Sequence, residues 1–425
     1  MTDFLDVQGI SHAGLAELQQ IEQLAQKRPL IASECCSCQS ERGFDHGTLQ
    51  PAGFPYNGTA GKNYPSFNGD CLQQQVNLTD SMPSVAGSMI WTFGDYIGES
   101  LAWPSVSSSF GAVDLAGFPK AGAQWFAAWW LNSESPLSVA SRPPLPKGVT
   151  LHIVESNEPR QQSSGNGISN SNSNSNSTAG SSNATFHVYS SADTVELLVN
   201  GRTLGEKSNA EWMGWTEWNT SWVAGNVTAI ARGARGGEAI ATHSRVTAGA
   251  AVAIVLQLDA PSETTATGRK VVLDGHDVAL VRATVVDARG VTVPSAAANI
   301  TFDIVSGPGR VFGVGNGDPQ CRLPHQVNWR PAFRGLSRAV VKVTVDGSRT
   351  GRTLGLIRSI DVESGKSTIH VQDPASAGSN DPIVIQASAP GLGSAMLSIP
   401  VSTSTLVDGV LASARASLTS AVSLE

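Results

Sequence analysis

In the first third of the chain, the hydrophobic positions form short apolar runs. A segment whose apolar residues have helical spacing lies between the first two runs. Residues 4–10 and 30–32 are apolar runs of strand length, and Leu and Ile recur every three or four positions within residues 12–27. That recurrence puts apolar side chains on one face of a helix. A third apolar run at 85–93 and an aromatic-rich helical segment at 120–131 follow. This alternation predicts a parallel α/β barrel, of which only about three of the eight strands are present.

The pattern changes after residue 131. Residues 132–148 are rich in proline and predict a linker. Short alternating runs with Gly, Asn and Asp turns then predict two all-β sandwich domains, at 149–249 and, immunoglobulin-like, at 250–403. Within the first, the Ser/Asn tract 161–183 is too polar to bury a core and predicts a disordered insertion. Residues 404–425 form a tail.

The strands expected in the two sandwiches are read directly from these runs. They cover residues 150–156, 184–190, 195–201, 226–232 and 241–247 in the first domain and 253–258, 278–287, 300–305, 339–345 and 382–388 in the second. The predicted fold class is therefore multidomain: the C-terminal part of a (β/α)8 TIM barrel, residues 1–131, followed by two β-sandwiches.

Composition narrows the possible partners. Charged residues make up 15% of the chain and the formal net charge is -7, without a basic patch, so nucleic acid is not an expected partner. No apolar run reaches the roughly 18 residues of a membrane span, so no membrane partner is expected. The cysteine cluster CCSC lacks the paired spacing of a zinc site. We expect no metal and no cofactor.

Seven N-x-S/T sequons bear on the compartment. They lie at Asn57, Asn77, Asn176, Asn183, Asn219, Asn226 and Asn299. In a secreted eukaryotic protein they would be glycan sites on surface loops, and they favour an extracellular or secretory location. Chance occurrence in a chain rich in Asn, Ser and Thr is an equal alternative, so the compartment stays unknown.

Glu34 is the main candidate for chemistry. It ends the apolar run PLIASE, and parallel α/β barrels carry their catalytic side chains at the carboxyl ends of their strands. A carboxylate at that place can attack the anomeric carbon of a sugar or stabilise an oxocarbenium-like transition state. A helix-capping or salt-bridging Glu is the alternative, and spacing alone favours it.

Four further residues are candidates for substrate binding. Trp91 ends the run SVAGSMIW, where its indole would offer a flat face to a pyranose, although a core Trp is the alternative. Asp95 and Glu99 follow in GDYIGES and would accept hydrogen bonds from sugar hydroxyls, unless they are solvated loop carboxylates. His12 follows the first strand and would face the same edge, unless it is an ordinary surface histidine.

Two long motifs resemble a known family. PLIASECCSCQSERG and VAGSMIWTFGDYIGES look like the last barrel strands of glycoside hydrolase family 2, in particular its β-galactosidase-type branch. The resemblance implies a retaining glycosidase acting on β-glycosides or oligosaccharides, with Glu34 as the nucleophile and Trp91 lining the sugar subsite. VYSSADTVELLVNGRTLGEK and ITFDIVSGPGRVFGVGNGDP resemble the sandwich domains that follow the barrel in this family.

The chain departs from the family pattern in two places. His12 stands where many members have a tyrosine that hydrogen-bonds the nucleophile. The acid/base of the family is a Glu preceded by Asn on an earlier strand, and the pair Asn157-Glu158 lies in the wrong domain to serve. We therefore expect the chain to lack its acid/base strand and to be completed by an N-terminal segment of the same protein. The alternatives are a subunit that completes a split barrel and a catalytically inactive carbohydrate-binding or structural sandwich module.

Overall fold

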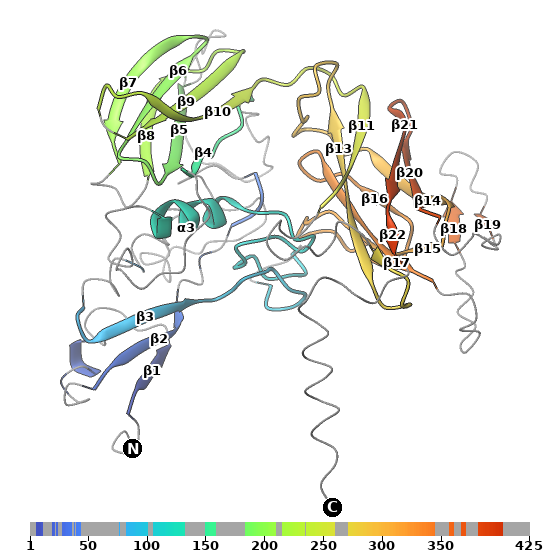
Figure 1. The fold of residues 1–425 in the computed structure, drawn as a ribbon, viewed down its shortest axis with the longest axis horizontal. Coiled ribbons are helices and arrows are strands. Elements are labelled where there is room, and N and C mark those ends of the chain that lie inside the picture. The colour runs from blue at the N-terminus through green and yellow to red at the C-terminus, as the bar shows by residue number, and fades with distance from the viewer. Residues whose placement is uncertain are drawn as a thin grey trace, which may run out of the picture. The chain divides into compact units, whose positions relative to one another are not determined.

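A computed structural model gives the architecture of the 425-residue chain (Figure 1). It describes residues 6–11, 19–21, 23, 28–35, 38, 40–43, 76, 82–100, 105–131, 149–158, 183–209, 215–233, 235–259, 271–344, 357–360, 367–370 and 381–402. The chain divides into two compact units, Met1–Ala248 with Gly317–Cys321, and Gly249–Asn316 with Arg322–Glu425. No helix in the described ranges is long and apolar enough to cross a membrane.

The first unit begins with a three-stranded parallel sheet. Its strands are β1 (Gln8–Ser11), β2 (Leu30–Cys35) and β3 (Val85–Ile90), in the order β1-β2-β3. Leu30 is fully buried and Ala32 nearly so, as expected for the central strand of a parallel sheet. The three apolar runs are confirmed as strands. Three strands cannot close a barrel, so the eight-stranded architecture stays a prediction.

The aromatic-rich segment forms the predicted helix, α3 (Ala121–Leu131). It is apolar nearly all round, which is typical of a helix covered on several sides. Trp125 and Ala128 are fully buried. They share one hydrophobic cluster with Tyr189 and Trp215 of the following sandwich. This shared core explains why the parallel sheet, α3 and the first sandwich form one compact unit.

The first sandwich has two antiparallel sheets, ordered β4-β5-β8 and β10-β9-β6-β7. Its strands are β4 (Leu151–Ile153), β5 (Asn183–Ser190), β6 (Thr194–Val199), β7 (Arg202–Ser208), β8 (Trp215–Ser221), β9 (Asn226–Arg232) and β10 (Ala239–Val246). Alternate side chains of both sheets meet in one core that includes Ile153, Val188 and Leu197, all fully buried. The five predicted strands are present.

The second unit contains a larger sandwich. Its two main sheets are ordered β11-β13-β17-β15 and β16-β14-β20-β21, and the pairs β12-β22 and β18-β19 are additional. The strands are β11 (Ala253–Leu258), β12 (Val271–Val272), β13 (Val278–Val286), β14 (Asn299–Ser306), β15 (Gly309–Gly315), β16 (Trp329–Pro331), β17 (Leu336–Val343), β18 (Ile357–Ile360), β19 (Ser367–His370), β20 (Ile383–Ala389), β21 (Gly393–Ile399) and β22 (Val401–Ser402). Inward residues such as Val281, Phe302 and Ile385 are fully buried in one apolar cluster.

Several strands were not predicted. β7 reads RTLGEKS and is mostly exposed, so it carries few apolar residues to signal it. β15 contains three glycines and β21 begins with one, and glycine weakens a strand pattern. The linker 132–148, the tail 404–425, most of the expected helix at 12–27 and the tract 161–182 lie outside the described residues, whereas Asn183 begins β5.

Candidate active site

The carboxyl ends of the three parallel strands meet at one edge of the sheet. Ser11 is the last residue of β1, Glu34 the penultimate residue of β2, and Trp91 directly follows β3. Ser11 is the register partner of Glu34, and its hydroxyl donates a hydrogen bond to Glu34 Oε2 at 3.2 Å. Glu34 is half-buried. This edge therefore presents a positioned carboxylate beside an indole-bearing turn.

The other predicted site residues have different surroundings. Trp91 is 39% exposed, so part of the residue is accessible, and its peptide bond to Thr92 is cis. Glu99 is exposed at a positive φ of 43°. Asp95 is turned inward, and its side chain is only 3% exposed. His12 lies outside the described residues. The binding roles of these four residues stay predictions.

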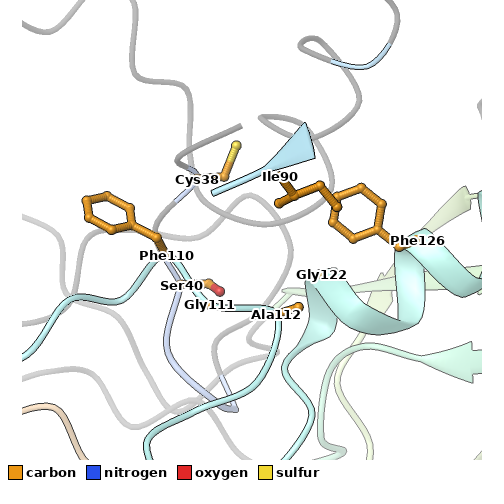
Figure 2. Close-up of a pocket in the computed structure, with 8 residues that line it drawn as sticks. All are labelled: Cys38, Ser40, Ile90, Phe110, Gly111, Ala112, Gly122 and Phe126. Carbon is orange, nitrogen blue, oxygen red and sulfur yellow. The ribbon is translucent and has the colours of Figure 1, made fainter. Parts of the chain in front are cut away.

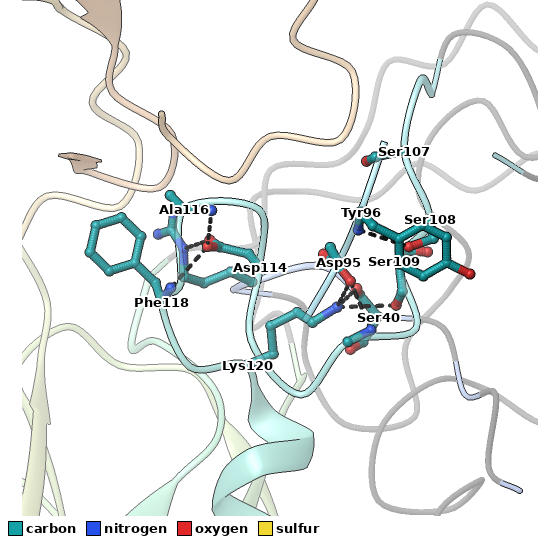
Figure 3. A network of polar contacts seen from close by, with 12 residues as sticks. Ser40, Asp95, Tyr96, Ser107, Ser108, Ser109, Asp114, Ala116, Phe118 and Lys120 are labelled. Atoms are coloured by element: carbon teal, nitrogen blue, oxygen red, sulfur yellow. Dashed lines mark hydrogen bonds and ion pairs between the residues drawn. The ribbon is translucent and has the colours of Figure 1, made fainter. Parts of the chain in front are cut away.

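Asp95 forms a buried ion pair with Lys120, which immediately precedes α3 (Figure 3). Lys120 Nζ lies 2.7 Å from Asp95 Oδ1, and it also donates to the carbonyls of Ser40 and Ser109. The backbone N–H of Gly111 donates to the same carboxylate. Burial raises the pKa of the Asp95 carboxyl to about 6, against the lowering effect of Lys120. Burial also lowers the pKa of the Lys120 ammonium.

A second buried pair lies in the same loop region. Arg42 Nε donates to Asp114 Oδ2 at 2.7 Å, and the guanidinium lies over the ring of Phe118, 5.0 Å from its centroid. The other carboxylate oxygen of Asp114 accepts the backbone N–H groups of Ala116 and Phe118. Together, the two ion pairs tie the segment that follows Glu34, residues 40–42, to the loops between β3 and α3. Paired and hydrogen-bonded charges are the form in which buried charges are tolerated.

A short segment from far along the sequence supports these loops. Gly317–Cys321 belongs to the first unit although its chain neighbours belong to the second. The carbonyl of Pro319 accepts the backbone N–H of Val106 at 2.9 Å and the hydroxyl of Ser105 at 3.4 Å. Gly317 has a φ of +80°, and a Cβ there would lie 1.8 Å from Asp114 Oδ2. The close approach therefore requires glycine.

A small pocket lies in the first unit, beside the start of α3 (Figure 2). It is lined by Cys38, Ser40, Ile90, Phe110, Gly111, Ala112, Gly122 and Phe126. Most of this lining is apolar, and neither Glu34 nor Trp91 contributes to it.

Sequence reasoning missed three residues at this edge. Ser11 contacts Glu34, whereas only its neighbour His12 was singled out. Lys120 was read as a helix end and is instead the partner of Asp95. Tyr96 lies between the two acids of GDYIGES and bonds to Trp91 and Glu99. An aromatic hydroxyl between two candidate carboxylates was the available signal for Tyr96.

Comparisons with known proteins bear on this site. The model of glycoside hydrolase family 2 C-terminal domain 5 matches residues 263–350, and the model of a domain of unknown function, DUF4982, matches residues 182–241. A β-galactosidase of Bacteroides ovatus, BoGH2A, is 29% identical over 276 residues, which are 64% of this chain and 27% of that enzyme. The chain is a relative of glycoside hydrolase family 2 proteins.

Solved structures share the fold of this family 2 relative. A β-glycosidase from Bacteroides vulgatus matches 94% of the chain with a TM-score of 0.66 and 19% identity. A β-glucuronidase from glycoside hydrolase family 2 matches 96% with a TM-score of 0.60 and 18% identity. The chain covers 46% and 36% of those two proteins and about a quarter of the B. ovatus enzyme. Neither family model reaches the segment that carries Glu34.

Proposed function

We propose that the natural protein, meaning residues 1–425 with any segments that its own transcript adds, is a retaining β-glycosidase. Glu34 is its nucleophile, and the exposed face of Trp91 is a wall of the sugar subsite. The observation that carries the proposal is the shared carboxyl edge of β1, β2 and β3, where Ser11 holds Glu34 next to the turn that begins at Trp91. Catalytic side chains of parallel α/β barrels lie at this edge.

The chemistry follows from the carboxylate. A Glu34 oxygen bonds to the anomeric carbon as the bond from that carbon to the leaving oxygen breaks, and the leaving oxygen takes a proton from a second carboxylic acid. The second group then removes a proton from water, which attacks the anomeric carbon and releases Glu34. Retention needs the two carboxyl groups about 5–5.5 Å apart. We assign the second group to a segment outside residues 1–425, within a complete (β/α)8 barrel.

The names of the similar proteins support the substrate class. The B. ovatus relative is named a β-galactosidase, and the structural neighbours are named a β-glycosidase and a β-glucuronidase. A β-linked glycoside is common to all three names. Residues 1–425 alone would lack general acid catalysis, which is worth roughly 10²–10⁴-fold, so we expect them to be nearly inactive by themselves.

The test is turnover of p-nitrophenyl β-galactoside and β-glucuronide by the natural protein. Glu34→Gln should lower kcat by more than about 10³-fold, because an amide cannot form the glycosyl-enzyme. Glu238→Gln, at an exposed residue before β10, is the matched control and should leave kcat unchanged. Full activity in Glu34→Gln, or no turnover of any β-glycoside by the natural protein, would overturn the proposal.

A further inference from the structure

The turn after β3 carries a chain of hydrogen bonds between three side chains. The indole N–H of Trp91 donates to the hydroxyl of Tyr96 at 3.0 Å. That hydroxyl donates its own proton to the Glu99 carboxylate. The rings of Trp91 and Tyr96 meet edge to face, with an interplanar angle of 86° and centroids 6.2 Å apart, a favoured aromatic geometry. The orientation of the exposed indole is therefore fixed by Tyr96.

The backbone of this turn is held on both sides. The backbone N–H of Tyr96 donates to the Ser108 hydroxyl at 3.1 Å, and the carbonyl of Tyr96 accepts the Ser108 N–H at 2.9 Å. Two residues on, Gly98 donates to the carbonyl of Val106. The preceding residue, Asp95, is buried against Lys120 (Figure 3). Exposed side chains on such a fixed turn are preorganised for binding.

The direction of each hydrogen bond between Trp91, Tyr96 and Glu99 can be assigned. Partial burial and the hydrogen bond to Glu99 raise the pKa of the Tyr96 phenol, so the phenol keeps its proton at neutral pH. Its single O–H is used on Glu99, and its oxygen accepts from Trp91. Among the described residues, Glu99 accepts only through Oε2. The Glu99 carboxylate is thus held in one orientation, through Tyr96, beside the partly exposed indole.

We propose that Glu99, ordered by Tyr96 next to Trp91, makes the sugar subsite selective for neutral glycosides over uronides. The inference rests on the proposed function and adds the substrate class. A carboxylate accepts hydrogen bonds from neighbouring sugar hydroxyls. The carboxylate of a uronide would meet a like charge there, and repulsion of this kind lowers the affinity for the wrong partner. Both neutral and uronic sugars occur in the names of the similar proteins, so both classes belong in the test.

The first experiment measures kcat/KM of the natural protein for p-nitrophenyl β-galactoside and β-glucuronide. The unaltered protein should favour the galactoside. Glu99→Gln keeps the size of the side chain and removes its charge, so the ratio of glucuronide to galactoside kcat/KM should rise by about 10- to 100-fold. Glu238→Gln should leave the ratio unchanged. A ratio that does not move in Glu99→Gln would overturn the inference.

The second experiment tests the ordering role of Tyr96 without substrate. The indole N–H signal of Trp91 is assigned in a 1H-15N spectrum of the natural protein by its loss in Trp91→Phe. Tyr96→Phe removes the acceptor, so that signal should shift upfield and exchange faster with water. An unchanged signal would contradict the ordering role. Absence of any glycoside turnover would contradict the proposed function. Turnover with an unchanged ratio of glucuronide to galactoside kcat/KM in Glu99→Gln would contradict this inference alone.

Discussion

Two regions of the molecule are stabilised by opposite means. The sandwich of the second unit buries a continuous apolar cluster in which residues such as Val281, Phe302 and Ile385 are fully covered. The loops between β3 and α3 have few strand ladders, and buried ion pairs hold them instead, chiefly Asp95 with Lys120. Burial of apolar area is non-directional, whereas a hydrogen-bonded ion pair fixes one geometry. The ion pairs therefore fix the geometry of the loops near Glu34. The apolar core stabilises the sandwich without fixing particular polar contacts.

The largest expected effects come from removing one key group in each region. Phe302→Ala leaves a cavity in the sandwich and should cost about 3–5 kcal/mol. Lys120→Met leaves the Asp95 carboxylate buried without its cation and should cost the first unit about 3–5 kcal/mol at neutral pH. Hydrogen exchange followed by mass spectrometry in increasing urea resolves the two units. Each variant should destabilise its own unit, and Lys120→Met should also disturb the turn at Tyr96, which follows Asp95.

A double variant is the control for the ion pair. Asp95→Asn/Lys120→Met removes both charges and should recover much of the lost stability, because no charge is left unpaired. If the single and double variants were equally unstable, packing rather than charge would hold the loops, and the contrast between the two regions would disappear.

The next effect is a pH dependence confined to the first unit. The pKa of Asp95 is raised in the folded protein from 3.8 to about 6, so folding favours the protonated form. This contribution to stability is full below about pH 4 and is lost as the pH rises through about 6, up to roughly 3 kcal/mol. The difference in unfolding free energy between the natural sequence and the Asp95→Asn/Lys120→Met variant should fall over this range.

Tryptophan fluorescence can follow the unfolding of the first unit at each pH. Of the ten tryptophans, all but Trp329 lie in the first unit. Denaturation curves at pH 4 and pH 7 give the two differences. A difference that is constant, or that rises with pH, would show that Asp95 is not held as a buried carboxyl.

The smallest effect concerns a close backbone approach. A Cβ on Gly111 would lie 2.2 Å from the backbone nitrogen of Asp95 and 2.5 Å from the carbonyl oxygen of Val113. Gly111→Ala should therefore cost about 1–3 kcal/mol through forced backbone shifts. Gly233→Ala, where nothing lies within 4 Å of the new Cβ, is the matched control. Equal thermal stability of the two variants would mean that the loops yield easily.

The sequence predicts the regular parts of this molecule better than its loops. Apolar runs and turn residues identify β2, β3, α3, β9 and β11 because period and burial go together there. β7 is missed because an exposed edge strand has no apolar face to reveal it.

The candidate site divides in the same way. Glu34 can be proposed from its place at the end of a buried strand. The partner of Asp95 cannot, because Lys120 lies 25 residues away and the pairing depends on loop geometry. The approach of Gly317 to Asp114 joins residues about 200 positions apart, and no local pattern encodes it.

The most direct test of the central claim is covalent trapping of the nucleophile. The natural protein is incubated with 2,4-dinitrophenyl 2-deoxy-2-fluoro-β-galactoside, whose electron-poor second carbon slows release of the glycosyl-enzyme, and the labelled peptide is sequenced by mass spectrometry. Our account predicts one label for each protein molecule, attached to Glu34 and absent in Glu34→Gln. A stoichiometric label on another carboxylate, such as Glu99 or Asp95, would contradict it.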